Sequence, residues 1–243
     1  MTRTSTRSKR VDSLVLRRTD YGEADFILLV FTNDLGIISV HARGARKGTK
    51  RFSGGIEPFH GLTLTLDAPN HGELYRLREA ELRRLRLTLV QNLTAMNVAG
   101  RALSWVRRSL PPLTPEPAVF FAIENLLDQL DLQPPNSTSA GEALLAEFGL
   151  NLLSHLGWAI ELSRCIRCGR LCPQGVPALL DPRRGGLVCR SCGGGPYRLS
   201  AMLRNIMLEA SRGTLAELSG LDASMVLDIV EDTLAHHPGV NDG

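Results

Sequence analysis

The sequence lacks the features that mark membrane, secreted and disulfide-framed proteins. Its 243 residues contain no run of about 18 apolar residues, so we expect no transmembrane helix. The basic residues 1–10 are not followed by the apolar stretch that a secretory leader requires, so we expect a cytoplasmic protein. The hydrophobic fraction of 43% is typical of a globular chain that is long enough to bury a substantial core.

The motifs of the common enzyme classes are also missing. The sequence has no G-x-x-x-x-G-K-[ST] phosphate loop, no G-x-S-x-G nucleophile turn and no H-E-x-x-H metal motif, and its six histidines are scattered. Three acids lie close together at Asp20, Glu23 and Asp25, but acids beside a turn usually face water or cap the backbone. Because a catalyst needs a positioned acid, base, nucleophile or metal, we predict that the protein is not an enzyme.

Cysteine is scarce and confined to one segment. All five cysteines lie between Cys165 and Cys192, and an odd number packed so closely does not form the disulfide framework of a secreted domain. Four of them form two C-x-x-C pairs, Cys165 with Cys168 and Cys189 with Cys192, with twenty residues between the pairs. Two such turns can place four thiolates around one metal ion at about 2.3 Å each.

The same segment predicts how the metal site folds. Gly169 and Gly193 each follow a pair, where a tight turn favours a residue that tolerates positive φ. Residues 179–188 predict a short hairpin whose turn begins at Pro182. Because four cysteines leave no coordination position open, we predict structural rather than catalytic Zn²⁺, with iron as the alternative metal. Cys172 is predicted not to be a ligand, although it could exchange with one or respond to oxidation.

Charge is distributed unevenly along the chain, although the net charge is only +3. Residues 42–51 read ARGARKGTKR, with five cations and no acid, and residues 76–108 hold eight arginines against two acids. From residue 199 onward, seven acids face two arginines. This asymmetry predicts one surface that binds a polyanion and another that faces solvent or a partner protein. The alternative is that all of these charges simply keep the surface hydrated.

The basic segment is the best candidate for contact with nucleic acid. It links two predicted strands, and each cation that neutralises a phosphate releases condensed counterions. Phe52 and Phe59 lie at its end and could stack on bases, but a phenylalanine beside a strand is more often part of the core. Two further arginines alternate on the last predicted strand and so share one face. The predicted nucleic-acid-binding residues are Arg43, Arg46, Lys47, Lys50, Arg51, Arg76 and Arg78.

The hydrophobic pattern divides the chain into a β part and a helical part. Five short strands are predicted at residues 12–19, 25–32, 36–43, 60–68 and 72–82. Five strands in this length indicate a small closed barrel or two small sheets, and an OB-type barrel, which commonly binds single-stranded nucleic acid, has this strand count.

The rest of the chain is predicted to be helical. Helices are expected at residues 89–110, 115–130, 142–158, 199–211, 214–218 and 223–237, the second of them with Thr114 as N-cap and Pro115 at its first position. The predicted fold class is therefore α+β. It comprises an OB-fold domain at residues 1–82 and a helical domain at residues 83–243, with a four-cysteine zinc finger inserted at about 161–197.

Two stretches resemble the family of bacterial recombination mediator proteins called RecO. Residues 15–59 are similar to the N-terminal domain of that family, through the D-Y-G-E-x-D motif at Asp20–Asp25, the turn that contains Leu35 and Gly36, and the segment ARGARK…RF…EPF. The two C-x-x-C pairs, with GGLVCRSC and the LS that follows, resemble the zinc-bearing members.

The resemblance implies a fold and a function. RecO-like proteins have an N-terminal OB-fold, a helical bundle and, in many members, a zinc finger in the helical domain. They bind single- and double-stranded DNA, anneal complementary strands and, with RecR, help to load RecA onto DNA coated by the single-stranded-DNA-binding protein. The expected partners are therefore both forms of DNA, RecR and the single-stranded-DNA-binding protein, near the nucleoid and without a membrane partner. The family's basic OB surface corresponds to Arg43, Arg46, Lys47, Lys50 and Arg51.

Two other functions remain open from the residues themselves. An RNA- or ribosome-associated zinc-ribbon protein also needs a basic barrel and a four-cysteine metal site. A zinc hydrolase or nuclease is a more distant alternative, because it requires an open coordination position that four cysteines do not leave.

Overall fold

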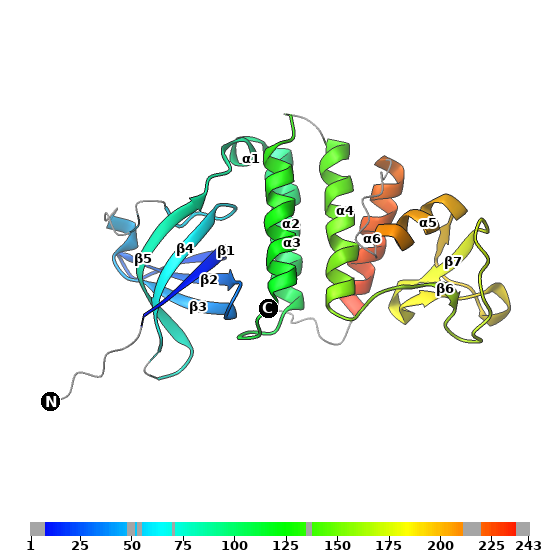
Figure 1. Ribbon diagram of the computed structural model, residues 1–243, viewed down its shortest axis with the longest axis horizontal. Coiled ribbons are helices and arrows are strands. Elements are labelled where there is room, and N and C mark those ends of the chain that lie inside the picture. Colours follow the sequence, from blue (N-terminus) through cyan, green and yellow to red (C-terminus); the bar gives the residue numbers. More distant parts are fainter. Residues whose placement is uncertain are drawn as a thin grey trace. The chain divides into compact units, whose positions relative to one another are not determined.

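The structure is a computed structural model that describes residues 8–47, 52, 55–69, 71–134, 138–210 and 220–236 (Figure 1). The chain divides into two compact units, and the predicted boundary between residues 82 and 83 stays a prediction. The first unit contains the β-barrel and comprises Met1–Gln91 and Leu110–Asp131. The second unit contains the four-cysteine segment and comprises Asn92–Ser109 and Leu132–Gly243.

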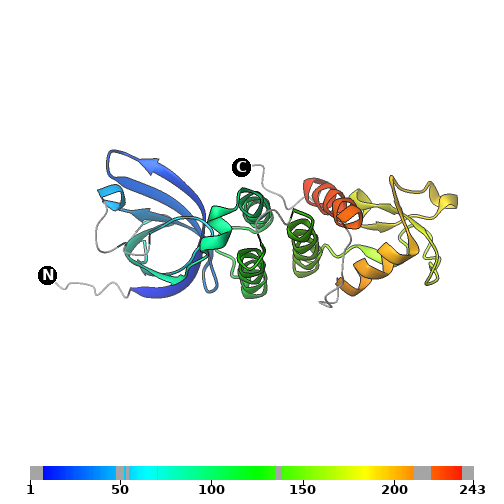
Figure 2. The same cartoon turned by 90° about the horizontal axis from the view of Figure 1, so that it is seen from above.

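The first unit is built around a closed barrel of five strands in the order β1-β2-β3-β5-β4. Neighbouring strands are antiparallel except β3 and β5, which run parallel, and the pairing of β1 with β4 closes the barrel (Figure 2). The prediction of a small closed five-stranded barrel is confirmed. Its strands are β1 (Lys9–Tyr21), β2 (Asp25–Thr32), β3 (Gly36–Ala42), β4 (Gly61–Asp67) and β5 (Leu74–Arg84).

The alternation of side chains along the strands produces the barrel core. In β4 the three leucines Leu62, Leu64 and Leu66 are fully buried, whereas the threonines between them are partly exposed. Burial of each leucine contributes about 1.5–3 kcal/mol. Phe52, from the segment between β3 and β4, is also part of this core. The interpretation of Phe52 as a core residue is confirmed, so its ring is not available to a nucleic-acid base.

Helix α3 (Pro117–Asp131) belongs to the same unit as the barrel and packs against β2, where the rings of Phe31 and Phe120 meet edge to face at 5.5 Å. The short helix α1 (Leu87–Gln91) packs against α3. The predicted start of α3 at Pro115 was wrong by two residues.

The chain before α3 follows the barrel surface instead of entering the helix. The amide of Leu113 donates to the carbonyl of Ile37 at 3.0 Å, and the hydroxyl of Thr114 donates to the carbonyl of Pro112. Thr114 is therefore not a helix cap. Gly36 makes this approach possible, because a Cβ on it would lie 2.2 Å from the carbonyl oxygen of Thr114.

A buried arginine joins the end of β5 to α3. Arg86 is 1% exposed and donates to the carboxylate of Asp128 at 2.8 Å and to the carbonyl of Phe59 at 2.7 Å. It also contacts Glu124, which is itself buried, at 3.3 Å. Burial lowers the pKa of Arg86, and Glu124 opposes this by favouring the charged form. The guanidinium thus depends on the two carboxylates for compensation of its charge.

The second unit contains a helical layer and a small β-sheet. Helix α4 packs against both α2 and α6, and Gly149 allows close contact, because a Cβ there would lie 2.8 Å from Val230 and 2.9 Å from Trp105. The helix predicted at residues 214–218 falls outside the described residues. No helix in the described ranges is long and apolar enough to span a membrane. The helices are α2 (Leu93–Ser109), α4 (Thr138–His155), α5 (Ala201–Ala210) and α6 (Gly220–His236).

Four short strands form a sheet around the cysteine segment, in the order β6-β8-β7-β9. We call residues 161–199 the small lobe. The predicted hairpin is confirmed, with Leu180 opposite Leu187 and a turn that ends at Gly185 with φ 77°. The strands are β6 (Glu161–Cys165), β7 (Ala178–Asp181), β8 (Gly186–Leu187) and β9 (Tyr197–Leu199).

Candidate metal centre and nucleic-acid surface

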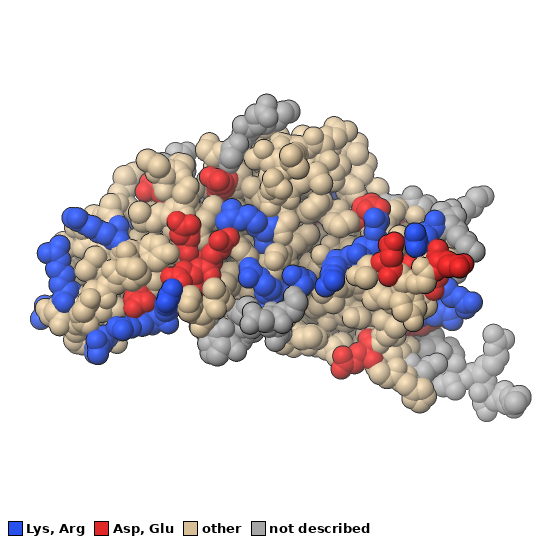
Figure 3. All heavy atoms as spheres, turned by 180° about the vertical axis from the view of Figure 1, so that it is seen from behind, with Lys and Arg blue, Asp and Glu red and all other residues tan. Residues whose placement is uncertain are grey.

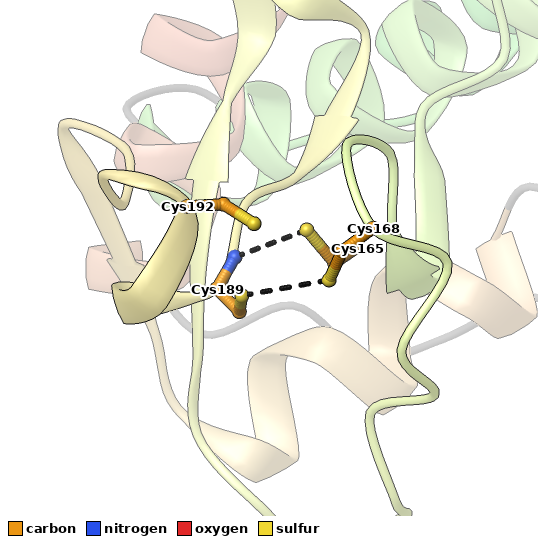
Figure 4. A group of neighbouring side chains, drawn as sticks. All are labelled: Cys165, Cys168, Cys189 and Cys192. Atoms are coloured by element: carbon orange, nitrogen blue, oxygen red, sulfur yellow. Dashed lines mark hydrogen bonds between the residues drawn. The ribbon is translucent and has the colours of Figure 1, made fainter.

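The two C-x-x-C pairs come together in the small lobe. The sulfur atoms of Cys165, Cys168, Cys189 and Cys192 all lie within 4.8 Å of one another, and they point toward a common centre (Figure 4). The Sγ atoms of Cys168 and Cys189 are 3.8 Å apart. A tetrahedral site with bonds of about 2.3 Å has sulfur-to-sulfur edges of about 3.8 Å, so the donor set fits a metal ion.

Backbone hydrogen bonds hold each pair in a tight turn. After the first pair, Gly169 has φ 71° and its amide donates to the carbonyl of Cys165 at 2.9 Å. After the second pair, Gly193 has φ 107° and its amide donates to the carbonyl of Arg190. The predicted need for positive φ at both glycines is confirmed. The amide of Cys189 points at the Sγ of Cys165 at 3.4 Å, which links the two turns across the site.

The four thiols strongly affect one another's protonation. The backbone amides of Cys189 and Cys168 lower the pKa of Cys165 to about 6. The neighbouring thiols of Cys189 and Cys168 raise the pKa of Cys192 to about 12. Amide donors stabilise the first thiolate, whereas each later thiolate must form beside sulfur atoms that already share the site. A divalent cation offsets the unfavourable interaction between neighbouring thiolates, so the cluster can hold a metal ion with all four sulfurs deprotonated.

Cys172 is not part of the sulfur cluster and has a different partner. Its Sγ lies 2.6 Å from Nη1 of Arg204, which is 1% exposed. Arg204 also donates to the carbonyls of Val176 at 2.9 Å and Pro173 at 2.8 Å. Arg204 therefore fixes the loop that follows the first pair. Sequence reasoning missed this role and counted Arg204 only among the cations of the C-terminal part, because its partners Cys172 and Val176 lie 32 and 28 positions away in the chain.

The start of the basic segment is held by the acid that ends the D-Y-G-E-x-D motif. One carboxylate oxygen of Asp25 accepts the amide of Gly44 at 2.8 Å, and the other lies 2.7 Å from Nε2 of His41. The Gly44 amide, followed by His41, lowers the pKa of Asp25. Asp25 is therefore a positioning residue for the basic segment, whereas the sequence had indicated a hydrated or capping acid.

Three of the predicted nucleic-acid contacts lie near one edge of the barrel. Arg43 and Arg46 follow the end of β3 and are exposed, and Arg76 is exposed on the strand beside it, opposite His41. Arg46 lies 3.5 Å from Asp20, whereas Arg43 and Arg76 form no ion pair with a described residue.

The other four predicted contacts are Arg78, Lys47, Lys50 and Arg51, and only the side chain of Arg78 is described. Arg78 is exposed but binds Asp67 at 2.6 Å, so part of its charge is already compensated. Lys47 ends a short 3₁₀ turn, and its side chain is not described. Lys50 and Arg51 lie outside the described residues. The assignment of all seven cations to a nucleic-acid surface stays a prediction.

The fold and the cluster define the class of protein: a closed five-stranded barrel followed by helices and a four-cysteine centre that could hold a metal ion. Two family descriptions match this chain in succession, Recombination protein O N terminal over residues 7–86 and Recombination protein O C terminal over residues 90–227. The chain belongs to the RecO family, whose role is in DNA repair and recombination.

Curated relatives agree with the family over most of the chain. The DNA repair protein RecO of Anaeromyxobacter sp. (strain K) is 30% identical over 230 residues, which cover 95% of this chain and 85% of the relative. The protein of the same name from Geobacter metallireducens is 32% identical over 192 residues, covering 76% and 73% of the two chains. That of Myxococcus xanthus is 31% identical over 182 residues, covering 75% and 71%.

Proposed function

We propose that the protein is a recombination mediator that binds single- and double-stranded DNA and anneals complementary strands. In the cell it would act with RecR to load RecA onto DNA coated by the single-stranded-DNA-binding protein, in the cytoplasm at the nucleoid. The proposal rests on membership of the RecO family and on the exposed cations Arg43, Arg46 and Arg76 at one edge of the barrel. Lys47, Lys50 and Arg51 continue the same basic segment in the sequence.

The proposed mechanism requires no bond to be made or broken, so the protein is not expected to be an enzyme. Two complementary strands repel each other through their phosphates. Cations on the protein reduce this repulsion and release counterions, and the bases stay free to pair. Affinity should therefore depend strongly on salt and weakly on sequence.

We propose that the metal is Zn²⁺ and that its role is structural. It would be held by Cys165, Cys168, Cys189 and Cys192, all of which offer thiolates, and this donor set suits zinc in a closed tetrahedral site. The strands of the small lobe are only two to five residues long, so a metal crosslink between its two turns would supply much of its stability.

Strand annealing over a range of salt tests the function. The metal-loaded protein should accelerate the pairing of two complementary oligodeoxynucleotides without nucleotide, and the acceleration should fade as salt rises. The variant R43A/R46A/R76A should bind a single strand with a salt slope lower by about 2, because each phosphate contact on a single strand contributes about 0.7. The outcome that contradicts the proposal is absence of acceleration at low salt, and acceleration of RNA pairing alone would favour the RNA-binding alternative.

A matched control separates phosphate contact from general charge. The variant R10A/R18A/R84A removes three cations from the same unit, but each of these arginines already pairs with an acid: Arg10 with Glu81, Arg18 with Glu57 and Arg84 with Asp128. We expect its salt slope to stay close to that of the unmodified protein. Equal slopes for the two variants would mean that DNA responds to net charge and not to this edge of the barrel.

A further inference from the structure

The small lobe contains a pocket beside the sulfur cluster. Its volume is about 420 Å³, within the range of about 300–1,000 Å³ that is common for small-molecule sites. Apolar side chains form much of its wall, and no acid is among the residues that line it. The residues that matter for its chemistry are Leu171, Val176, Leu179, Arg170, Arg190 and Arg198.

The three arginines at this pocket are free to bind an anion. Arg170, Arg190 and Arg198 are exposed, and their side chains form no ion pair or hydrogen bond with any residue that the structure describes. The small lobe, at the left of the view in Figure 3, carries many more basic than acidic side chains. Three uncompensated guanidinium groups around one hollow make a focused positive potential.

The other arginines of the lobe show that this freedom is a local property. Arg164, Arg183 and Arg184 each lie within 3.4 Å of a carboxylate oxygen. Their acidic partners are Glu161, Asp232 and Asp181 respectively. Arg167, the remaining arginine of the lobe, donates to the carbonyl of Cys192. Every lobe arginine away from the pocket therefore has a described partner, whereas the three at the pocket have none among the described residues.

The pocket also exposes apolar surface that the fold does not use. Leu171 is 70% exposed and Val176 is 44% exposed, although both are large aliphatic side chains next to a cavity. Arg204 holds their loop in place through the carbonyls of Cys172, Pro173 and Val176, so the exposure belongs to a fixed surface. Apolar surface beside cations fits a ligand that has both a flat apolar face and negative charge.

We propose that this pocket binds nucleotides of single-stranded DNA. A base would pack against Leu171 and Val176, and the phosphates on either side would contact Arg170, Arg190 and Arg198. Duplex DNA would bind less well, because its bases are stacked and cannot enter a pocket. The inference rests on the proposed function and deepens it: the second unit would hold a strand of its own, as an annealing protein needs when the barrel holds the other.

Cys172 provides a reporter inside the site. It lines the pocket, is half-buried and stands apart from the four clustered cysteines. In the metal-loaded protein, iodoacetamide should therefore modify Cys172 while the four ligand cysteines are protected. An oligothymidylate should slow this modification, and the same mass of duplex DNA should slow it much less.

Charge-matched variants test which arginines bind the strand. The variant R170A/R190A/R198A should bind oligothymidylate about 100-fold more weakly at about 0.1 M salt, because three contacts of about 0.7 in the salt slope are lost. The control R164A/R183A/R184A removes the same charge from the same lobe but only from paired arginines, and it should retain most of the affinity. Metal content and thermal melting of both variants establish that the lobe is intact.

Three results would overturn the inference. Alkylation of Cys172 at an unchanged rate with saturating oligothymidylate would mean that the strand does not enter the pocket. Equal affinities of the two triple variants would mean that the pocket arginines have no special role. Stronger protection by a poly-glutamate peptide than by oligothymidylate would assign the pocket to a protein partner. In each case, annealing that still depends on the barrel arginines would leave the proposed function standing, whereas absence of all DNA binding would remove both.

Discussion

The contact between the barrel and α3 allows a test of how burial sets the strength of an ion pair. Arg84 and Arg86 both pair with Asp128, but the side chain of Arg84 is 50% exposed and that of Arg86 is 1% exposed. Replacing Arg86 by methionine keeps much of the apolar stem and removes the charge. It leaves the carbonyl of Phe59 without this donor and removes one of two arginines from the buried Glu124, which still pairs with Arg83.

The expected cost follows from these contacts. Loss of one member of a buried ion pair typically costs about 3–5 kcal/mol, because the remaining charge stays buried without compensation. An exposed pair is worth about 0–1 kcal/mol. Because Glu124 keeps Arg83 and Asp128 keeps Arg84, we expect Arg86→Met to lower the free energy of unfolding of the first unit by about 3 kcal/mol, at the low end of this range. Arg84→Met should lower it by less than about 1 kcal/mol.

Chemical denaturation can measure this effect in the intact chain. Both tryptophans, Trp105 and Trp158, belong to the second unit, so their fluorescence reports that unit, whereas far-ultraviolet circular dichroism reports both. Arg86→Met should shift the dichroism transition and leave the fluorescence transition in place. Equal losses for Arg84→Met and Arg86→Met would refute the reasoning, since burial would then not decide the strength of these pairs.

Two further predictions concern the second unit. Cys189→Ser should lose the metal and lower the melting temperature of the chain, whereas Cys172→Ser should keep its full metal content. Metal analysis and calorimetry measure both effects. Full metal occupancy in Cys189→Ser would contradict the ligand assignment. Gly149→Ala should destabilise the helical layer by about 1–3 kcal/mol, because the new methyl would lie 2.8 Å from Val230. Gly100→Ala, in α2 with open space around it, should be neutral or stabilising by up to about 1 kcal/mol, and equal effects at the two glycines would contradict the packing argument.

Both units contain arginines that pair with acids and arginines that form no ion pair with a described residue. On the barrel, many of the described arginines are engaged by acids, among them Arg10, Arg18 and Arg78. At the pocket of the small lobe, the arginines have no such partners within the described ranges. If DNA contacts were judged from the number of cations alone, the barrel would dominate. Because the guanidinium groups at the pocket are not paired with acids, the small lobe is a second candidate surface for DNA.

The sequence by itself determined the features that depend on local spacing. Short apolar runs bounded by turn residues predicted the five strands, and in residues 62–66 a two-residue period also indicated one solvent-facing side. The C-x-x-C spacing predicted that each pair forms one turn, and Gly169 and Gly193 have the positive φ that was expected of them. The hairpin between the pairs followed from the turn residues after Pro182. Each of these signals lies within about ten residues of the structure that it specifies.

The tertiary structure decided the features that depend on residues far apart in the chain. Arg84 and Asp128 are separated by 44 positions, and Cys172 and Arg204 by 32, so neither pair has a signature that a local pattern could carry. The same holds for the arginines that stay unpaired, because a guanidinium is free only when no folded neighbour supplies an acid. Closure of the barrel through the pairing of β1 with β4 likewise joins residues far apart in the chain. Composition therefore determined how much positive charge the protein has, and folding decided where that charge is available.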